Sequence, residues 1–355
     1  MRILLFGDFS GIHKNLQEGL QELGYQSTLV SSGDGYKNLP SDISFSYDAS
    51  KVFGHIYGRL KPFVFLPIFK GYDIVQLISP YYLRYKYFPA SFYYYLLRKF
   101  NKKFFTAAAG MDPYFWRYGR LKMKYGPFDD FLKYDLNQKF CKFQLPDEFI
   151  FNEKIVSFSN GIIADCYEYG LSYEGHPNYK GYIPLPVNIS KIKYQDNVPG
   201  KKLKIFHGLT RYGYKGTRHV EKAFEILSAK YPNQLDLKID GRMPQNEYLK
   251  LVRDSNIVID QTNSYGLGIN GVSALAMGKI VLGGSEPEDL KAIGVENSPV
   301  INIIPNHKSI VNAIESLLIR KKEIQRIGYE SRKYTEKVHS HLIVAKKYLS
   351  IWNSN

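Results

Sequence analysis

Short apolar segments alternate with helical segments through both halves of the chain, and this alternation restricts the possible folds more than any other feature. Strands separated by helices imply parallel sheets with right-handed crossovers. The pattern therefore predicts an α/β protein with two doubly wound, Rossmann-like domains. The predicted strands are residues 2–6, 26–30, 73–78, 103–107 and 161–164 in the first half, and 203–206, 235–239, 257–260, 280–282 and 300–304 in the second.

A proline-rich stretch, residues 182–202, lies between the two halves. Its prolines break regular structure, and a polar run joins them. We therefore expect one domain to cover residues 1–185 and another to cover residues 186–335. A chain of 355 residues is long enough for each domain to bury its own core.

The composition, with 44% apolar and 23% charged residues, is typical of a globular protein in water. No apolar run approaches the roughly 20 residues that span a bilayer. The apolar start of the chain is too short for a signal peptide and leads into a Gly-Asp turn. Cys141 and Cys166, the only cysteines, form neither a disulfide framework nor a metal-ligand pattern. We expect a cytoplasmic protein without a bound metal.

The net charge of +15 favours an anionic partner. Nucleotide diphosphates, phospholipid headgroups, lipid-linked pyrophosphates and nucleic acid all satisfy that condition. A biased genome also produces chains rich in Lys, Tyr and Asn. Charge by itself does not choose among these explanations.

The segment KIFHGLTRYGYKGT, residues 204–217, reads as a strand, a basic loop and the start of a helix. The first N–H groups of a helix and its positive dipole end attract anions. Arg211 can fork onto phosphate oxygens, and Lys215 adds a point charge. This loop predicts a diphosphate site. The alternative is a surface loop whose two cations are solvated.

A second segment, residues 255–284, reads as a buried strand, a glycine-rich loop, a helix of small residues and another buried strand. The loop spells G-x-G-x-x-G at Gly266, Gly268 and Gly271. A dinucleotide site is disfavoured, because the loop lies late in its domain and no acidic residue follows about 20 positions on. The loop's N–H groups can meet a phosphate or a sugar hydroxyl, and a plain tight turn is the alternative.

These two segments resemble the retaining glycosyltransferases of the GT-B fold that form family four, the group 1 transferases. In that family, a strand ending in His-Gly is followed by Arg and then by Lys-Gly-Thr. Here the same order is found in His207, Gly208, Arg211 and residues 215–217.

The second segment carries the rest of the resemblance. Residues 273–281 stand where the family has Glu-Ala-Met-Ala-x-Gly-x-Pro-Val, and Asp260 with Gln261 matches a branch that carries Asp-Gln there. The resemblance covers most of residues 203–285 and follows residues 1–190 in outline.

Two family glutamates are absent, because their positions hold Tyr265 and Ser273. In the family, the first lies near the donor sugar and the second holds the ribose hydroxyls. Ser273 can make a hydrogen bond but cannot grip two hydroxyls as a carboxylate does.

The resemblance implies a GT-B architecture with two domains facing a central cleft, where the ligand binds. It also implies that the last segment, residues 336–355, returns to pack on the first domain. A helix is predicted from about Ser331 to Trp352. The donor-binding residues that we predict are Gly7, Gly11, His13, His207, Gly208, Asp260, Gln261, Tyr265, Gly266, Gly268, Ile269, Asn270, Gly271 and Ser273.

Two turns of the first half supply the remaining candidates. The turn after the first strand, with Gly7, Gly11 and His13, stands where the family approaches the donor phosphates and the acceptor; His13 is alternatively a satisfied histidine at a helix start. Asp112 lies where the family often reads His-Gly-x-Asp, although Ala109 replaces the histidine. Asp112 either binds an acceptor hydroxyl or caps the next segment.

The mechanism expected from the resemblance needs little acid–base machinery. The sequence shows no paired carboxylates, Ser-His-Asp set or metal-ligand cluster. In a retaining enzyme of this type, the departing phosphate is thought to take the acceptor proton. Arg211 and Lys215 then stabilise the leaving diphosphate, Asp112 contributes on the acceptor side, and no cofactor is expected.

The stretch from Tyr81 to Phe105 is rich in aromatic, Lys and Arg residues. Such a surface suits an anionic membrane. Alternatively, half of the rings belong to a core and the lysines form its wet edge. Stacking on nucleic acid is the least favoured interpretation.

We therefore expect a retaining, metal-independent glycosyltransferase. It would move a sugar from a nucleotide sugar to a glycan or lipid-linked acceptor in cell-surface polysaccharide or glycolipid synthesis, at the inner face of the membrane. The absent glutamates favour the main alternative, a catalytically silent GT-B protein that binds a sugar or nucleotide. A nucleic-acid-binding protein is the third hypothesis.

Overall fold

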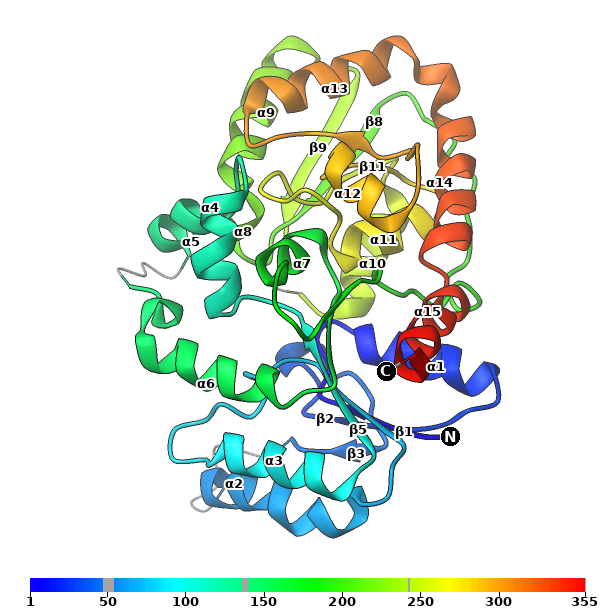
Figure 1. The fold of residues 1–355 in the computed structure, drawn as a ribbon. Coiled ribbons are helices and arrows are strands. Elements are labelled where there is room, and N and C mark those ends of the chain that lie inside the picture. Colours follow the sequence, from blue (N-terminus) through cyan, green and yellow to red (C-terminus); the bar gives the residue numbers. More distant parts are fainter. Residues whose placement is uncertain (47–53, 136–139, 242, 355) are drawn as a thin grey trace. The chain divides into compact units, whose positions relative to one another are not determined.

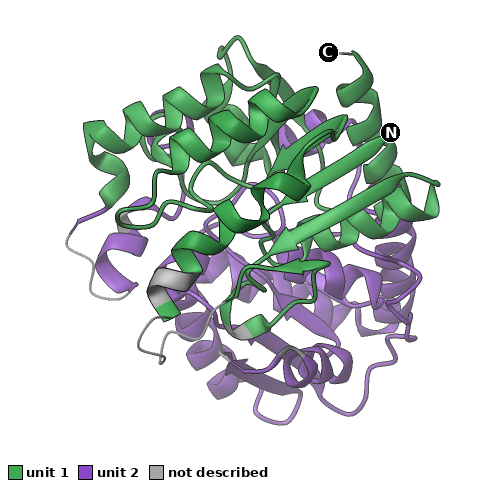
Figure 2. Cartoon of the chain, turned by 90° about the horizontal axis from the view of Figure 1, so that it is seen from below, with its two compact units in different colours: residues 1–118, 142–186, 341–355 green, residues 119–141, 187–340 purple. Residues whose placement is uncertain are grey.

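The computed structural model describes residues 1–46, 54–135, 140–241 and 243–354. The chain forms two compact units, coloured separately in Figure 2. Unit 1 comprises residues 1–118, 142–186 and 341–355, and unit 2 comprises residues 119–141 and 187–340. No helix among the described residues is long and apolar enough to cross a membrane.

Unit 1 contains a seven-stranded parallel sheet in the order β3-β2-β1-β4-β5-β6-β7 (Figure 1). Its strands are β1 (Arg2–Phe6), β2 (Gln26–Ser31), β3 (Ile43–Ser44), β4 (Ile74–Leu77), β5 (Lys103–Ala108), β6 (Gly161–Ala164) and β7 (Tyr179–Tyr182). Its principal helices are α1 (Ile12–Glu22), α2 (Gly54–Phe65), α3 (Ala90–Phe100), α6 (Pro146–Ser157), α7 (Tyr167–Tyr173) and α15 (His341–Ser354).

Alternation along β1 explains how both faces of this sheet are covered, because successive side chains of a strand point to opposite faces. Ile3 and Leu5 pack with residues of α1 and α15. Phe6, on the opposite face, meets an aromatic cluster that includes Phe69 and Tyr93. The first helix, α1, buries Leu16 and Leu20, and Gly24 follows it with φ 85°.

Unit 2 contains a five-stranded parallel sheet in the order β12-β11-β10-β8-β9. Its strands are β8 (Leu203–Gly208), β9 (Leu235–Asp240), β10 (Ile257–Ile259), β11 (Ile280–Gly283) and β12 (Ile301–Asn302). Its helices are α4 (Arg120–Lys122), α5 (Phe128–Tyr134), α8 (Tyr212–Lys215), α9 (Thr217–Lys230), α10 (Gln245–Asp254), α11 (Ile269–Ala276), α12 (Pro287–Ile293), α13 (His307–Ile319) and α14 (Ile324–Val338).

The same alternation covers the second sheet. Ile205 and Ile257 pack into a cluster with α9, α13 and α14, whereas Phe206 and Val258 pack with α10 and α11. Two doubly wound parallel sheets were predicted from the sequence, and the structure confirms them.

Some predicted elements differ from the structure. β3 and β7 were not predicted, because β3 has only two residues and β7 is half-buried throughout, without an apolar run. The predicted strand 300–304 is reduced to β12. The helix predicted from Ser331 to Trp352 is interrupted between α14 and α15, where the carbonyl of His339 accepts the N–H of Val187 and Ser340 pairs with Val187.

The unit boundaries also differ in detail from the predicted domains. Residues 119–141, which were assigned to the first domain, belong to unit 2, because α5 packs on α8. The other changes of unit fall at Pro186/Val187 and Ser340/His341. α15 belongs to unit 1 and packs against α1, where the carbonyl of His341 approaches Gly19 so closely that a Cβ there would lie 2.3 Å away.

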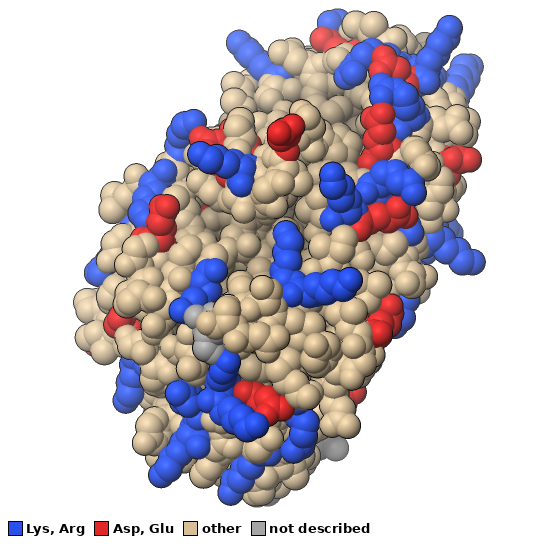
Figure 3. Space-filling view, turned by 45° about the vertical axis from the view of Figure 1, so that its right-hand side comes forward, with Lys and Arg blue, Asp and Glu red and all other residues tan. Residues whose placement is uncertain are grey.

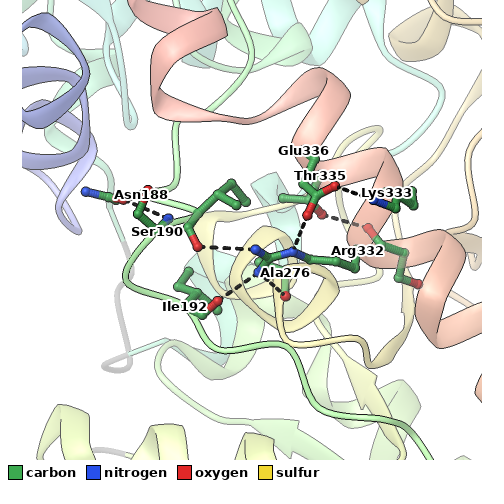
Figure 4. Close-up of polar contacts among 10 residues, drawn as sticks. Asn188, Ser190, Ile192, Ala276, Arg332, Lys333, Thr335 and Glu336 are labelled. Carbon is green, nitrogen blue, oxygen red and sulfur yellow. Dashed lines mark hydrogen bonds and ion pairs between the residues drawn. The ribbon is translucent and has the colours of Figure 1, made fainter. Parts of the chain in front are cut away.

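Arg332 of α14 forms hydrogen bonds with the proline-rich stretch within unit 2 (Figure 4). Its Nη1 donates to the carbonyl oxygens of Ile192 at 2.8 Å and Ala276 at 2.9 Å, and its Nη2 donates to that of Ile189 at 3.3 Å. Glu336 accepts from Nε at 2.7 Å. The Arg332 side chain thus connects the first residues of the 187–340 segment with the end of α11 and with α14.

Candidate functional site

In each sheet, the strand order reverses beside the first strand of the unit. In unit 1 the reversal lies between β1 and β4, and in unit 2 it lies between β8 and β10. Open α/β sheets bind ligands outside the carboxyl ends of the strands at such a switch point. The predicted site residues follow these strands, so each switch point is described in turn.

His207 forms hydrogen bonds with two other elements at the switch point of unit 2. Its Nδ1 lies 2.9 Å from the carbonyl oxygen of Ile259, and its Nε2 lies 2.9 Å from Oγ1 of Thr217. Burial lowers the pKa of His207 to about 4. The neutral ring therefore donates from Nδ1 and accepts at Nε2 from the threonine hydroxyl. This residue, predicted to bind the donor, joins β8, β10 and the start of α9.

Lys215 and Asp260 form a buried ion pair beside His207. Lys215 Nζ lies 3.0 Å from Asp260 Oδ1 and 3.4 Å from the carbonyl oxygen of Asp260. Both residues are buried. An ammonium group has three donors, so these two contacts leave one N–H that can point elsewhere. The pair fixes a cation at the carboxyl edge of the sheet.

The glycine-rich loop closes around the same carboxylate. The N–H of Gly268 donates to Asp260 Oδ2 at 2.7 Å. A Cβ on Gly271 would lie 2.8 Å from that oxygen, and a Cβ on Gly266 would lie 3.0 Å from an oxygen of Asp289. The loop glycines thus accommodate the protein's own carboxylates. One N–H that we expected to meet a ligand instead meets Asp260.

Arg211 lies at the start of α8 with an exposed side chain. Its guanidinium carbon is 4.0 Å from the ring centroid of Tyr214 and 5.1 Å from that of Phe131. Planar guanidinium groups stack on aromatic rings while their edges keep donating. Arg211 is thus held by stacking and remains at the surface.

Asp135, which was not predicted, caps the loop that carries these cations. Its Oδ1 accepts the N–H of Gly213 at 2.6 Å, and its Oδ2 accepts that of Tyr214 at 2.9 Å. Gly213 is required because a Cβ there would lie 2.1 Å from the carbonyl oxygen of Asp130. Asp130 also pairs with Arg218 at 2.9 Å.

Residues 119–141 reach the glycine-rich loop as well. The hydroxyl of Tyr265 accepts the N–H of Lys124 at 2.9 Å, and the ring of Tyr265 lies 5.0 Å from that of Tyr125 between centroids. Tyr125 in turn donates to Glu286 at 2.7 Å. Tyr265, at a position where the family has a glutamate, is therefore packed beneath this segment.

The other predicted residues of unit 2 surround this pair. Gly208 ends β8 beneath Tyr248, whose ring would be 2.7 Å from a Cβ there. Gln261 follows Asp260 and donates to the carbonyl of Gly266 at 3.4 Å. Ser273 is half-buried on α11, and Ile269 and Asn270 form the first turn of that helix, also half-buried.

In unit 1, the turn after β1 brings Gly7, Asp8 and His13 together. Gly7 has φ 86°, and a Cβ there would lie 2.3 Å from Ile78, which follows β4 across the switch point. Asp8 Oδ1 accepts the N–H of His13 at 2.9 Å. His13 Nδ1 lies 2.6 Å from the carbonyl oxygen of Gly7. Gly11, with φ 82°, precedes α1.

Two buried atoms of this turn, Oδ2 of Asp8 and Nε2 of His13, have no hydrogen-bond partner among the described residues. Burial raises the pKa of Asp8 to about 7 and lowers that of His13 to about 4. The neutral His13 ring donates from Nδ1 to Gly7, so its Nε2 is an acceptor. One alternative from the sequence was a histidine with all of its hydrogen bonds made at the helix start. In the structure, only Nδ1 of the His13 ring has a hydrogen-bond partner among the described residues.

Asp112 follows β5 and is buried. Its Oδ1 accepts the N–H of Phe115 at 2.7 Å, and its Oδ2 accepts the hydroxyl of Tyr173 at 2.7 Å. Burial raises the pKa of Asp112 to about 6. The structure therefore shows the capping arrangement, one of the two alternatives that the sequence left open.

No protein-family model and no curated relative matches the sequence. Solved structures match it over its full length. HepE from Anabaena, in complex with UDP and glucose, has a TM-score of 0.63 at 11% identity, covering 99% of this chain and 100% of that chain. Sucrose-phosphate synthase from Thermosynechococcus elongatus has a TM-score of 0.65 at 12% identity, covering 100% and 98%.

A glycosyltransferase from Rickettsia africae adds a third match, with a TM-score of 0.59 at 15% identity and coverage of 99% and 98%. The chain has the GT-B fold. The fold expected from the sequence is thereby confirmed. At these identities the likeness establishes the fold alone, and function has to be argued from the site.

Proposed function

We propose that the chain is a glycosyltransferase that takes its sugar from a nucleotide sugar. The observation that carries the proposal is the fixed cation at the switch point of unit 2, where Asp260 holds Lys215 at 3.0 Å. The exposed Arg211 lies at the start of the same short helix that ends at Lys215. The structurally similar HepE was solved with UDP and glucose, a nucleoside diphosphate and a sugar.

Charge stabilisation is the chemistry that these residues can supply. When the bond between sugar and diphosphate breaks, negative charge grows on the leaving phosphate, and Arg211 with the remaining N–H of Lys215 would stabilise it. One well-aimed donor of this kind typically contributes about 2.7–4 kcal/mol. Asp112 is left out of the reacting set, because both of its oxygens hold protein groups.

The turn after β1 would supply the opposite kind of group. Nε2 of His13 is an acceptor, and Oδ2 of Asp8 accepts when the carboxyl group is ionised and donates when it is protonated; a sugar hydroxyl can donate and accept. We assign these two atoms to hydroxyl binding. The acceptor of the reaction would be a glycan or a lipid-linked sugar, made for a cell-surface polysaccharide or glycolipid.

A direct test is to screen nucleotide sugars for thermal stabilisation and then to follow release of nucleoside diphosphate with an acceptor extract. Transfer with the anomeric configuration kept, observed by NMR of the product, would support the retaining mechanism. Turnover in excess EDTA is expected, because two cations supply the charge. Loss of turnover that magnesium or manganese restores would contradict this part.

A catalytically silent nucleotide-binding protein is the second candidate. It is favoured by Tyr265 and Ser273, which stand where the family keeps glutamates. Binding of a nucleotide sugar without transfer or hydrolysis, across the donor panel, would select it.

A further inference from the structure

A group of large apolar side chains lies exposed on neighbouring segments of unit 1. Leu60 and Val64 of α2, Ile68 of the following 3₁₀ turn, Tyr87, and Phe92 and Tyr95 of α3 are between 51% and 81% exposed. We call these six residues the docking face. On α2 and the turn after it they recur every fourth residue, and on α3 they are three apart, so each set lines one side of its segment.

The segments of the docking face are packed against each other. Tyr93 of α3 donates its hydroxyl to the carbonyl oxygen of Pro62 in α2 at 3.0 Å, and the rings of Phe63 and Tyr93 meet edge to face at 5.2 Å. The guanidinium of Arg59 lies 6.0 Å from the ring of Tyr87. Figure 1 shows α2 and α3 lying together below the sheet of unit 1. Their outward residues therefore belong to one surface.

Tyr87 is held in an unusual conformation. It has φ 65°, in a region that bulky side chains seldom adopt, and it is the most exposed residue of the docking face. Lys86 Nζ lies 4.9 Å from its ring centroid. The turn before α3 thus presents an aromatic ring and a cation to solvent at the expense of backbone strain.

The stretch of chain that carries the docking face is strongly cationic. From residue 54 to residue 105 the sequence contains a single acid, Asp73, which accepts from Lys102 at 2.6 Å. The same stretch contains Arg59, Lys61, Lys70, Arg84, Lys86, Arg98, Lys99, Lys102 and Lys103. On the face drawn in Figure 3, Lys and Arg outnumber Asp and Glu at its lower end, the level at which α2 and α3 lie in Figure 1.

We propose that the docking face binds the surface of an anionic phospholipid bilayer. Exposed aromatic and aliphatic side chains enter the headgroup region, and the cations of this stretch, among them Arg59 and Lys86 beside Tyr87, attract acidic lipids. A protein partner explains the near absence of acids less well, because protein interfaces do not require one sign of charge. The proposal does not depend on transferase activity.

The structure also shows which residues of the aromatic stretch are exposed enough to contact a membrane. In the aromatic stretch from Tyr81 to Phe105, the rings of Tyr82, Phe88, Tyr93, Tyr94, Phe104 and Phe105 are buried. Only part of that stretch faces solvent, and α2 with its following turn supplies the rest of the docking face.

The test is flotation of the full chain with phosphatidylcholine vesicles and with vesicles that also contain phosphatidylglycerol. Binding to the anionic vesicles that weakens as salt is raised is expected. The combined substitutions Val64→Ser, Tyr87→Ser and Phe92→Ser should weaken it by at least about tenfold, since three apolar side chains no longer leave water. Ile319→Ser in unit 2 removes an equally exposed apolar residue and should leave binding unchanged.

Absence of binding to anionic vesicles by the unmodified chain would overturn the proposal, and so would equal binding by the triple variant with its melting temperature unchanged. Salt-sensitive binding of nucleic acid that the triple variant loses, without vesicle binding, would assign the docking face to nucleic acid instead. These outcomes are read without any nucleotide sugar, so they are separate from success or failure of the proposed transferase.

Discussion

At the switch point of unit 2, the ionisable groups that follow β8 and β10 are paired with protein groups, whereas the turn after β1 in unit 1 leaves buried polar atoms with no partner among the described residues. Lys215 and Asp260 are paired, and both nitrogens of His207 are bonded. Asp8 and His13 each keep one buried atom without a partner. Both turns follow the first strand of a doubly wound sheet at its switch point.

The difference shows what each turn can offer a ligand. Paired groups give unit 2 a rigid frame that presents donors, which suits an anion with many acceptor oxygens. The atoms of unit 1 without a partner are one acceptor, Nε2 of His13, and one carboxyl oxygen of Asp8 that accepts or donates with its ionisation, which suits hydroxyl groups. The same topological position thus carries two complementary chemistries, and the predictions below test each side of that contrast.

The largest effect is expected on breaking the ion pair of unit 2. Lys215→Met should destabilise the protein by about 3–5 kcal/mol, because it leaves the buried carboxylate of Asp260 uncompensated. Chemical denaturation measures this loss. Adding Asp260→Asn to that variant should recover part of the stability. A cost below about 1 kcal/mol for Lys215→Met would show that the pair does not hold the turn.

Asp8 in unit 1 should give stability a pH dependence. Its pKa is raised from 3.8 to about 7, so its contribution is full below about pH 4 and is lost as the pH rises to about 7. Asp34 acts with burial to raise this pKa, and Lys37 opposes it. Asparagine does not ionise, so Asp8→Asn does not lose this stability. Between about pH 4 and pH 7, the free energy of unfolding of the variant should therefore rise relative to that of the unmodified protein, by at most about 4 kcal/mol.

Melting temperatures at a series of pH values measure the difference between the two proteins. Asp73→Asn is the matched control, because a hydrogen bond from Lys102 lowers the pKa of Asp73, and the difference should then run in the opposite direction. A flat difference for Asp8→Asn between pH 4 and 7 would mean that Asp8 is not a buried, uncompensated carboxyl group.

His207 in unit 2 should behave with the opposite sign. Its pKa is lowered from 6.5 to about 4, so its contribution is full above about pH 6.5 and is lost as the pH falls toward 4. His207→Phe should cost about 2–3 kcal/mol at pH 8, because the carbonyl of Ile259 and the hydroxyl of Thr217 lose their partner. Denaturation at pH 8 and pH 5 should show a smaller cost at pH 5, and equal costs would exclude a buried neutral ring.

A smaller effect is expected where the ribose would lie. Ser273 is half-buried on α11 and keeps part of its side chain in solvent, so Ser273→Glu should be tolerated and tighten donor binding modestly through a charge-assisted hydrogen bond. Titration of the donor into both proteins measures the change. Affinity reduced more than tenfold, with circular dichroism unchanged, would place the nucleotide differently from the family's arrangement.

How much of this was predictable from the sequence depends on the range of each interaction. β8 and β10 could be predicted, because their apolar runs and the turn residues after them are local signals. The bond from Gly213 to Asp135 joins residues 78 apart in the chain, and no local pattern encodes such a contact. Asp260 was predicted to bind the donor, but its contacts with Lys215 and Gly268 emerge only from the folded sheet.

The central claim is that unit 2 binds a nucleoside diphosphate through its exposed and its buried cation, and calorimetric titration with UDP tests it most directly. Arg211→Ala removes the exposed cation without touching the ion pair, and Lys222→Ala removes an exposed cation from α9 as the matched control. Binding should weaken by at least about tenfold, near 1.4 kcal/mol, for Arg211→Ala and stay unchanged for Lys222→Ala. Equal affinity of Arg211→Ala and the unmodified protein for UDP would contradict the claim.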